Sequence, residues 1–192
     1  MKILIATKNI SKFNTIKNML NEVIGDNCIY KNLLSYTDLV LKEEIGSNID
    51  RARDKAKDAY NQIEEKFDVV IGIDDGIIIN DIEYISVKEH LFDIMVGNKV
   101  PIGDKIYITR AYYAITNDGR EYNIYNKIPY IVRKKVETIE KEGYQLNSVI
   151  SMIDKDCVLN DMSDKELNDY YLAYSIEDLK KLINFINSKG DV

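Results

Sequence analysis

The opening of the sequence, MKILIATKNISKFNTIKNML, is the feature that most limits how the chain can fold. Lys2 to Ala6 form an apolar run of strand length, and a helical pattern of apolar residues begins near Ser11. The short polar loop between them directs backbone N–H groups and the positive end of a helix dipole toward one point, which favours an anion. The segment therefore predicts either a phosphate-binding loop or an ordinary first βα unit with a solvated turn.

The side chains of this loop also suit a phosphate. Thr7, Lys8 and Asn9 lie in the loop, Lys12 follows near the start of the helix, and all four can donate hydrogen bonds or positive charge. The segment has neither the Walker lysine pattern nor the glycine-rich dinucleotide fingerprint, so those two kinds of phosphate site are excluded here.

The net charge of the chain limits which molecules it can bind. The 192 residues include 26 Lys and Arg against 32 Asp and Glu, a formal net charge of -6, so no basic excess is present to bind a nucleic-acid duplex. A nucleotide needs only a few local cations and is not excluded. No apolar stretch approaches the length of a membrane span, and no secretory-type segment opens the sequence. Because the two cysteines also lie far apart, we expect a reduced, cytoplasmic setting.

A second charged segment follows the first helix. Glu44 precedes Gly46, and Ser47 or Asn48 can cap the helix that begins there. Lys55 lies at the border of the apolar stripe of this helix. Its ammonium group therefore either belongs to a solvated face or reaches into a cleft.

A third segment places two carboxylates next to a buried strand. Val69 to Ile73 have the β-branched composition of such a strand, and Asp74, Asp75 and Gly76 interrupt it. Buried carboxylates need a compensating charge, and Mg²⁺ binds one or two carboxylates together with water and phosphate oxygens. We therefore favour a metal site over the hairpin turn that an Asp-Gly pair also indicates.

The rest of the chain predicts a long hairpin, one more strand and two helices, with no repeat or linker, so we expect a single domain over residues 1–192. These elements are expected at Ile106 to Val132 with a turn at 117–120, Tyr144 to Ile153, Ser163 to Tyr171, and after Ser175. The tyrosines of the hairpin either stack on a base or form an amphipathic sheet face.

Assembled in order, these segments resemble the inosine/xanthosine triphosphate pyrophosphatase family, which clears non-standard purine nucleotides. The opening ILIATKN-x-x-K matches the signature start of that family, with Thr7, Asn9 and Lys12 at its phosphate-binding positions. The resemblance covers nearly the whole chain.

Two further motifs carry the resemblance. Glu44-x-Gly46, followed by a helix with Lys55-Ala56, is similar to the family's E-x-G…N-A-x-x-K-A segment. Asp74-Asp75-Gly76-Ile77 resembles D-S-G-L, whose Asp is the essential carboxylate of the family.

The resemblance implies a fold, a reaction and a site. The fold would be α/β, with a twisted mixed central sheet flanked by helices and a cleft between two lobes, in a homodimer. The reaction would be hydrolysis of a nucleoside triphosphate to a monophosphate and pyrophosphate, by magnesium-assisted attack of water on the α-phosphorus. Asp74 and Lys12 would be catalytic, Lys55 would join the loop in binding phosphate, and Glu44, Asp74 and Asp75 would hold Mg²⁺.

The sequence also departs from the family. Thr15 stands where the family has a metal-associated Glu, Arg51 replaces the Asn before Ala52, and Ala173-Tyr174-Ser175 lacks the His and Arg of the family's S-H-R. Because the last motif helps to hold the purine, the sequence does not name the base. Two alternatives therefore stay open: a nucleotide-binding regulatory protein without chemistry, and an interaction protein on an old enzyme scaffold.

Overall fold

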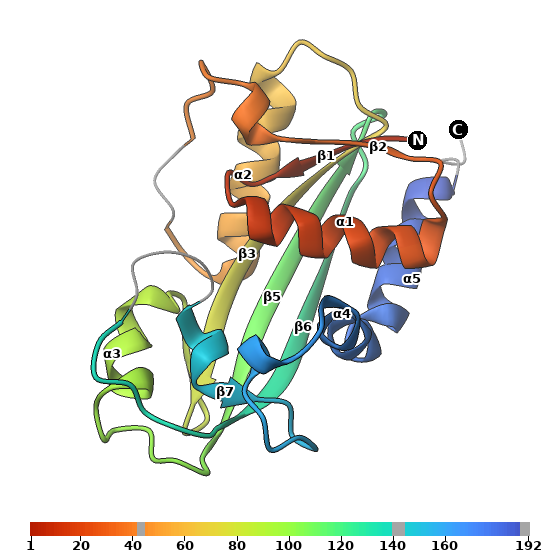
Figure 1. The fold of residues 1–192 in the computed structure, drawn as a ribbon. Coiled ribbons are helices and arrows are strands. Elements are labelled where there is room, and N and C mark those ends of the chain that lie inside the picture. The colour runs from red at the N-terminus through yellow and green to blue at the C-terminus, as the bar shows by residue number, and fades with distance from the viewer. Residues whose placement is uncertain (42–44, 140–144, 189–192) are drawn as a thin grey trace. The chain divides into compact units, whose positions relative to one another are not determined.

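The computed structural model describes residues 1–41, 45–139 and 145–188. Their helices and strands follow in the order β1 (Lys2–Ala6), α1 (Ile10–Ile24), β2 (Ile29–Asn32), α2 (Asn48–Gln62), β3 (Val69–Ile79), β4 (Ile82–Tyr84), α3 (Leu91–Met95), β5 (Lys105–Thr116), β6 (Glu121–Val132), β7 (Ile150–Ser151), α4 (Asp164–Ala173) and α5 (Ile176–Asn187). The strands form a mixed sheet in the order β2-β1-β3-β5-β6-β7 (Figure 1). Strand β4 pairs with β3 off this path. This architecture confirms the predicted α/β class with a mixed sheet flanked by helices. Among the described residues, no helix is long and apolar enough to span a membrane.

The chain divides into two compact units, and each has a hydrophobic core. The first unit comprises Met1–Asp74, Arg110–Asn126 and the chain from Ser175 onward, and the second comprises Asp75–Thr109 and Lys127–Tyr174. Strands β3, β5 and β6 each contribute residues to both units. The single domain and the cleft expected from the sequence stay predictions.

In the first unit, β1 is the strand around which the helices pack. It pairs in parallel with β2 and with β3, and Ala6 lies opposite Gly72. Because side chains alternate between the faces of a strand, Leu4 and Ala6 share one face, where the alanines of α2 join their core cluster. Ile3 and Ile5 are fully buried on the other face. Helices α1 and α5 of this unit lie side by side (Figure 1).

The second unit builds its core from the other ends of the long strands. Ile77, Ile106 and Ile128 come from β3, β5 and β6, and all three are buried in one cluster. Ile94 and Met95 of α3 belong to the same cluster, and tyrosines of α4 pack against it. The sequence pattern between Ser86 and Asp104 did not predict α3.

The structure corrects one prediction about β3. The strand runs without a break through Asp74, Asp75 and Gly76, so these residues form no hairpin turn. The turn lies instead at Asn80 and Asp81, whose φ angles of 51° and 62° lead into the antiparallel strand β4. Asn and Asp adopt this left-handed conformation more readily than other side chains do, which explains why the chain reverses there without glycine.

The other predicted elements are present at or near their expected bounds. The hairpin of β5 and β6 and the helices α1, α2, α4 and α5 confirm the sequence patterns. The strand expected from Tyr144 to Ile153 is reduced to β7, which a 3-10 turn at Gln145–Ser148 precedes. Tyr144 lies outside the described residues.

Candidate functional site

The loop between β1 and α1 is shaped by its own side chains. The Thr7 hydroxyl oxygen accepts a hydrogen bond from the N–H of Asn9 at 3.1 Å. The Asn9 side-chain oxygen caps α1 by accepting from the N–H of Lys12 at 2.9 Å. Thr7 is nearly buried, whereas Lys8 and Asn9 are exposed. Thr7 and Asn9 thus fix the loop, and each keeps hydrogen-bond donors that no described residue accepts.

The start of α1 offers backbone donors beside these side chains. Within the described part of the chain, the N–H groups of Lys8, Ile10 and Ser11 have no hydrogen-bond acceptor. They precede a helix of 15 residues, whose dipole favours negative charge at this end. These donors and the helix dipole are the features on which the predicted phosphate site rests, and the site itself stays a prediction.

Helix α2 reaches the same edge of the sheet because β3 carries glycine where the two elements cross. A Cβ atom on Gly72 would lie 1.9 Å from the carbonyl oxygen of Ala52 and 2.8 Å from the backbone nitrogen of Ala56. Only glycine allows this approach. It sets Arg51 and Lys55, one helical turn apart, over the part of β3 that contains Asp74.

The Asp74 carboxylate is the centre of a buried charge cluster. It is 4% exposed, and its two oxygens face different cations. The Lys55 ammonium lies 2.6 Å from Oδ1, and the Arg51 Nε lies 3.0 Å from Oδ2. The Lys55 contact is a hydrogen bond, whereas the Arg51 contact is an ion pair whose geometry falls short of one. Asp74 therefore has no need of a further cation to balance its charge.

Burial and charge act in opposite directions on Asp74. Burial is the larger effect and raises the pKa of this carboxyl above its ordinary value. The positive charges of Lys55, Arg51 and Lys12 oppose that rise and favour the carboxylate. Lys12, at the start of α1, thus acts electrostatically on the same group as the two cations of α2.

The structure brings together part of the predicted site. Lys55 contacts Asp74 directly, which decides between the solvated face and the inward orientation that the sequence left open. Glu44 lies outside the described residues, and Asp75 belongs to the second unit. In the sequence, Arg51 stands out only as a departure from the family motif, and its ion pair with Asp74 was not predicted. Its spacing of four residues from Lys55 was the available signal.

The described residues do not fit a divalent metal held by protein side chains. Within 1–41, 45–139 and 145–188, no three Asp, Glu, His or Cys residues cluster in a way that could hold a metal ion. Asp74 is the predicted ligand that can be placed in the first unit, and two cations already neutralise it. A divalent cation there would meet their repulsion.

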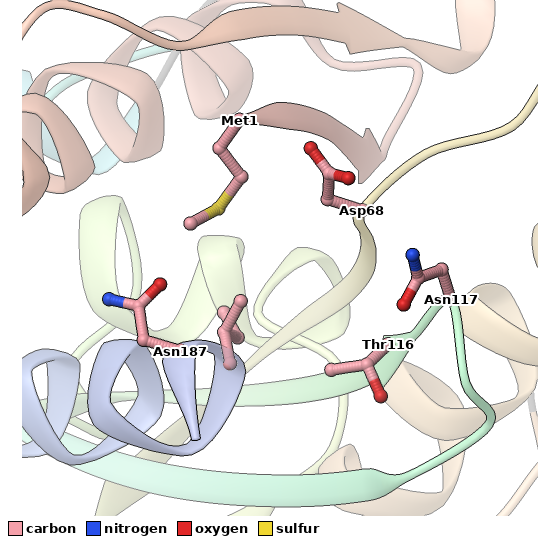
Figure 2. A pocket seen from close by; sticks show the side chains of 6 residues that line it. Met1, Asp68, Thr116, Asn117 and Asn187 are labelled. Atoms are coloured by element: carbon pink, nitrogen blue, oxygen red, sulfur yellow. The ribbon is translucent and has the colours of Figure 1, made fainter. Parts of the chain in front are cut away.

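A hollow of about 310 Å³ lies elsewhere in the first unit, and Figure 2 shows its lining. Met1, Asp68, Asn117 and Asn187 line it. Met1 and Asp68 precede β1 and β3, whereas Thr7 and Asp74 lie beyond the other end of the stretch in which these two strands pair. The hollow is thus at the opposite edge of the sheet from the charge cluster.

Comparison with solved structures identifies the fold. The chain superimposes on a nucleoside-triphosphatase / dITP/XTP pyrophosphatase from Mycobacterium abscessus with a TM-score of 0.61 and 14% identity, over 93% of this chain and 96% of the other. It also matches the Ham1 protein of Staphylococcus aureus (TM-score 0.63, 13% identity, 96% and 98% of the two chains). A HAM1 protein from Coxiella burnetii matches likewise (TM-score 0.66, 12% identity, 96% and 98%). No family model matches the sequence, and no curated protein matches it.

The chain therefore has the fold of the Ham1 and dITP/XTP pyrophosphatase structures along nearly its whole length. This confirms, for the fold, the resemblance drawn from the motifs of the sequence. At identities of 12–14% the agreement concerns the fold alone. The chemistry of this chain has to be argued from its own site residues.

Proposed function

We propose that this chain is a nucleoside triphosphate pyrophosphatase, which hydrolyses a nucleoside triphosphate to a monophosphate and pyrophosphate. The observation that carries the proposal is the pairing of buried Asp74 with Lys55 and Arg51, with Lys12 of α1 acting electrostatically on the same carboxyl. The Mycobacterium abscessus protein that shares the fold is described as a nucleoside-triphosphatase / dITP/XTP pyrophosphatase, which supports the same reaction class.

The charge of the cluster suits a triphosphate. Two cations contact one carboxylate and Lys12 adds a third positive charge that acts on it, so the site keeps positive charge after Asp74 is neutralised. The N–H groups of Lys8, Ile10 and Ser11 and the hydroxyl of Thr7 supply neutral donors beside these cations. Together they would hold the phosphate oxygens in the manner of other helix N-termini that bind phosphate.

Asp74 would orient the attacking water. Its Oδ2 is buried and ion-paired with Arg51, but it forms no hydrogen bond within the described chain, so it would accept one from a water that enters with the substrate. The water oxygen would bond to the α-phosphorus while the bond from that phosphorus to the bridging oxygen breaks. Pyrophosphate leaves, and a proton of the water passes through the Asp74 carboxylate to solvent. Lys12 and Lys55 would stabilise the charge that develops on the phosphate oxygens.

No step of this proposal requires magnesium held by the described residues. The metal-ligand roles of Glu44, Asp74 and Asp75, and the homodimer, stay predictions from the sequence resemblance. The base also stays open, since the altered Ala173-Tyr174-Ser175 segment gives no sign of which base the protein prefers.

The test is pyrophosphate release across a panel of ITP, XTP, dITP, the standard triphosphates and modified pyrimidine triphosphates. We expect release from at least one of them, and a decrease of about 100-fold or more in Asp74→Asn. Lys57→Ala is the matched control, because Lys57 lies on α2 but pairs with Glu121 at 3.0 Å. Release that survives in Asp74→Asn would overturn the assignment of this site.

A second function is favoured by the double pairing of Asp74. A carboxylate neutralised by two cations suits a binding protein that retains the triphosphate without cleaving it. That reading predicts thermal stabilisation by a triphosphate with no pyrophosphate released from any member of the panel. The same assay, run beside a melting curve, separates the two functions.

A further inference from the structure

We propose that Arg51 and Lys55 occupy the place of a divalent metal at Asp74, so that this chain binds triphosphate in its metal-free form. The inference rests on the triphosphate site proposed above and makes Arg51 a residue that determines which form of the substrate is bound. The sequence resemblance implies Mg²⁺ at Asp74, but the structure shows Arg51 and Lys55 at this carboxylate instead.

Each oxygen of the Asp74 carboxylate already faces a cation. Lys55 lies 2.6 Å from Oδ1 and Arg51 lies 3.0 Å from Oδ2, on the two oxygens that a metal would need. The three side chains are 5–14% exposed, so water screens these pairs little. A metal that bound Asp74 would have to displace at least one buried cation, which would then lack its partner.

The helix that carries the two cations also holds them in place. Ser47 and Asp50 form a capping box at the start of α2, in which each side chain accepts from the backbone N–H of the other. The contact of α2 with Gly72 leaves no room for the helix to shift toward the strand. Arg51 is therefore positioned before any ligand arrives.

The guanidinium group of Arg51 suits a phosphate as well as a carboxylate. Arginine is always charged, and its planar group matches the geometry of phosphate oxygens, as it does that of a carboxylate. A positive charge fixed on α2 neutralises an incoming phosphate as a metal ion would. It also repels the magnesium that accompanies a nucleotide in solution.

Binding of inorganic tripolyphosphate and of ITP, each measured by calorimetry with EDTA and then with Mg²⁺, tests the inference. We expect the dissociation constant in EDTA to be equal to or lower than that in Mg²⁺. Binding that is about tenfold tighter with Mg²⁺ would overturn the metal-free mode and leave the proposed function standing. Absence of binding under both conditions would overturn both proposals.

Arg51→Gln tests the residue itself. This variant should weaken metal-free binding about tenfold or more and make binding depend on Mg²⁺. Arg51→Lys keeps the charge and should stay metal-independent. Arg53→Gln is the matched control on the same helix, because Arg53 pairs with Asp50 at 3.0 Å and with Asp54 at 3.4 Å. Metal-free affinity that is unchanged in a folded Arg51→Gln would contradict the role of Arg51. If that variant fails to fold, the Mg²⁺ dependence of Arg51→Lys decides in its place.

Discussion

Asp74 shows how a single buried charge can organise a site. Its carboxylate is buried and forms ion pairs with Lys55 and Arg51 of α2. The positive charge of Lys12 on α1 also acts on it. Removal of one partner from a buried ion pair leaves the remaining charge without compensation. The residue therefore has a structural role as well as the catalytic one proposed for it.

This double role gives a prediction for Asp74→Asn. The variant should lower the free energy of unfolding by about 3 kcal/mol, because Lys55 and Arg51 are left facing each other without an anion. Tripolyphosphate should restore much of the lost thermal stability by supplying that charge. Asp54→Asn, which breaks a more exposed pair with Arg53 on the same helix, should change stability by less than about 1 kcal/mol. Equal melting temperatures for the two variants would contradict the account.

Glu65 gives a prediction of pH dependence. Its carboxylate accepts hydrogen bonds from Lys2, Lys31 and Tyr36, and these lower its pKa from 4.5 to about 2. As the pH falls, Glu65 is protonated in the unfolded chain before it is protonated in the folded chain. The stability that the Glu65 carboxylate gives to the fold is therefore complete above pH 4.5 and is lost as the pH falls toward 2.

The comparison of melting temperatures between wild type and Glu65→Gln measures this effect. The difference should be largest above pH 4.5 and should vanish near pH 2. Glu64→Gln is the neighbouring control, since Glu64 makes no ion pair with the described residues. A difference that does not change with pH would show that Glu65 acts through packing alone.

At the scale of elements, the crossing of α2 over β3 determines whether the site can form. Gly72 lies under Ala52 and Ala56, and backbone atoms of the helix occupy the space that a side chain would need. Gly72→Ala should therefore destabilise the protein by about 3 kcal/mol or more, because a helix backbone cannot yield as a flexible side chain can.

The control for Gly72→Ala is Gly119→Ala in the hairpin turn. A Cβ there would meet no atom within 4 Å, and only the φ of 83° opposes it, at about 1 kcal/mol. Denaturant unfolding of both variants measures the difference. A Gly72→Ala protein as stable as wild type would show that α2 does not approach β3 as described.

The elements also show what periodicity can predict. Helices α1 and α2 and the hairpin of β5 and β6 follow local patterns and appear where these patterns place them. The prediction that the strand is interrupted at Asp74 was wrong. It rested on two charged residues in an apolar run, which suggested a break. Packing from α2 supplies the compensating cations, so the strand continues. The compensating cations are distant from Asp74 in the sequence, so a local sequence pattern cannot predict them.

For the whole molecule, the order of the motifs predicted the fold that the solved structures share at identities of 12–14%, although no family model matches the sequence. The candidate residues Thr7, Lys12, Lys55 and Asp74 lie in one compact unit, although up to 67 positions separate them in the sequence. The partner of Arg51 could not be predicted, because it depends on how closely α2 approaches the sheet. The base preference is likewise absent from the motifs.

The central claim is that this site cleaves a triphosphate between its α- and β-phosphorus atoms through attack of water at the former. The most direct test is hydrolysis of the best substrate of the panel in ¹⁸O-labelled water, with mass analysis of both products. We predict one labelled oxygen in the nucleoside monophosphate and none in the pyrophosphate. Label in pyrophosphate, release of orthophosphate as the first product, or no turnover of any triphosphate would contradict the account.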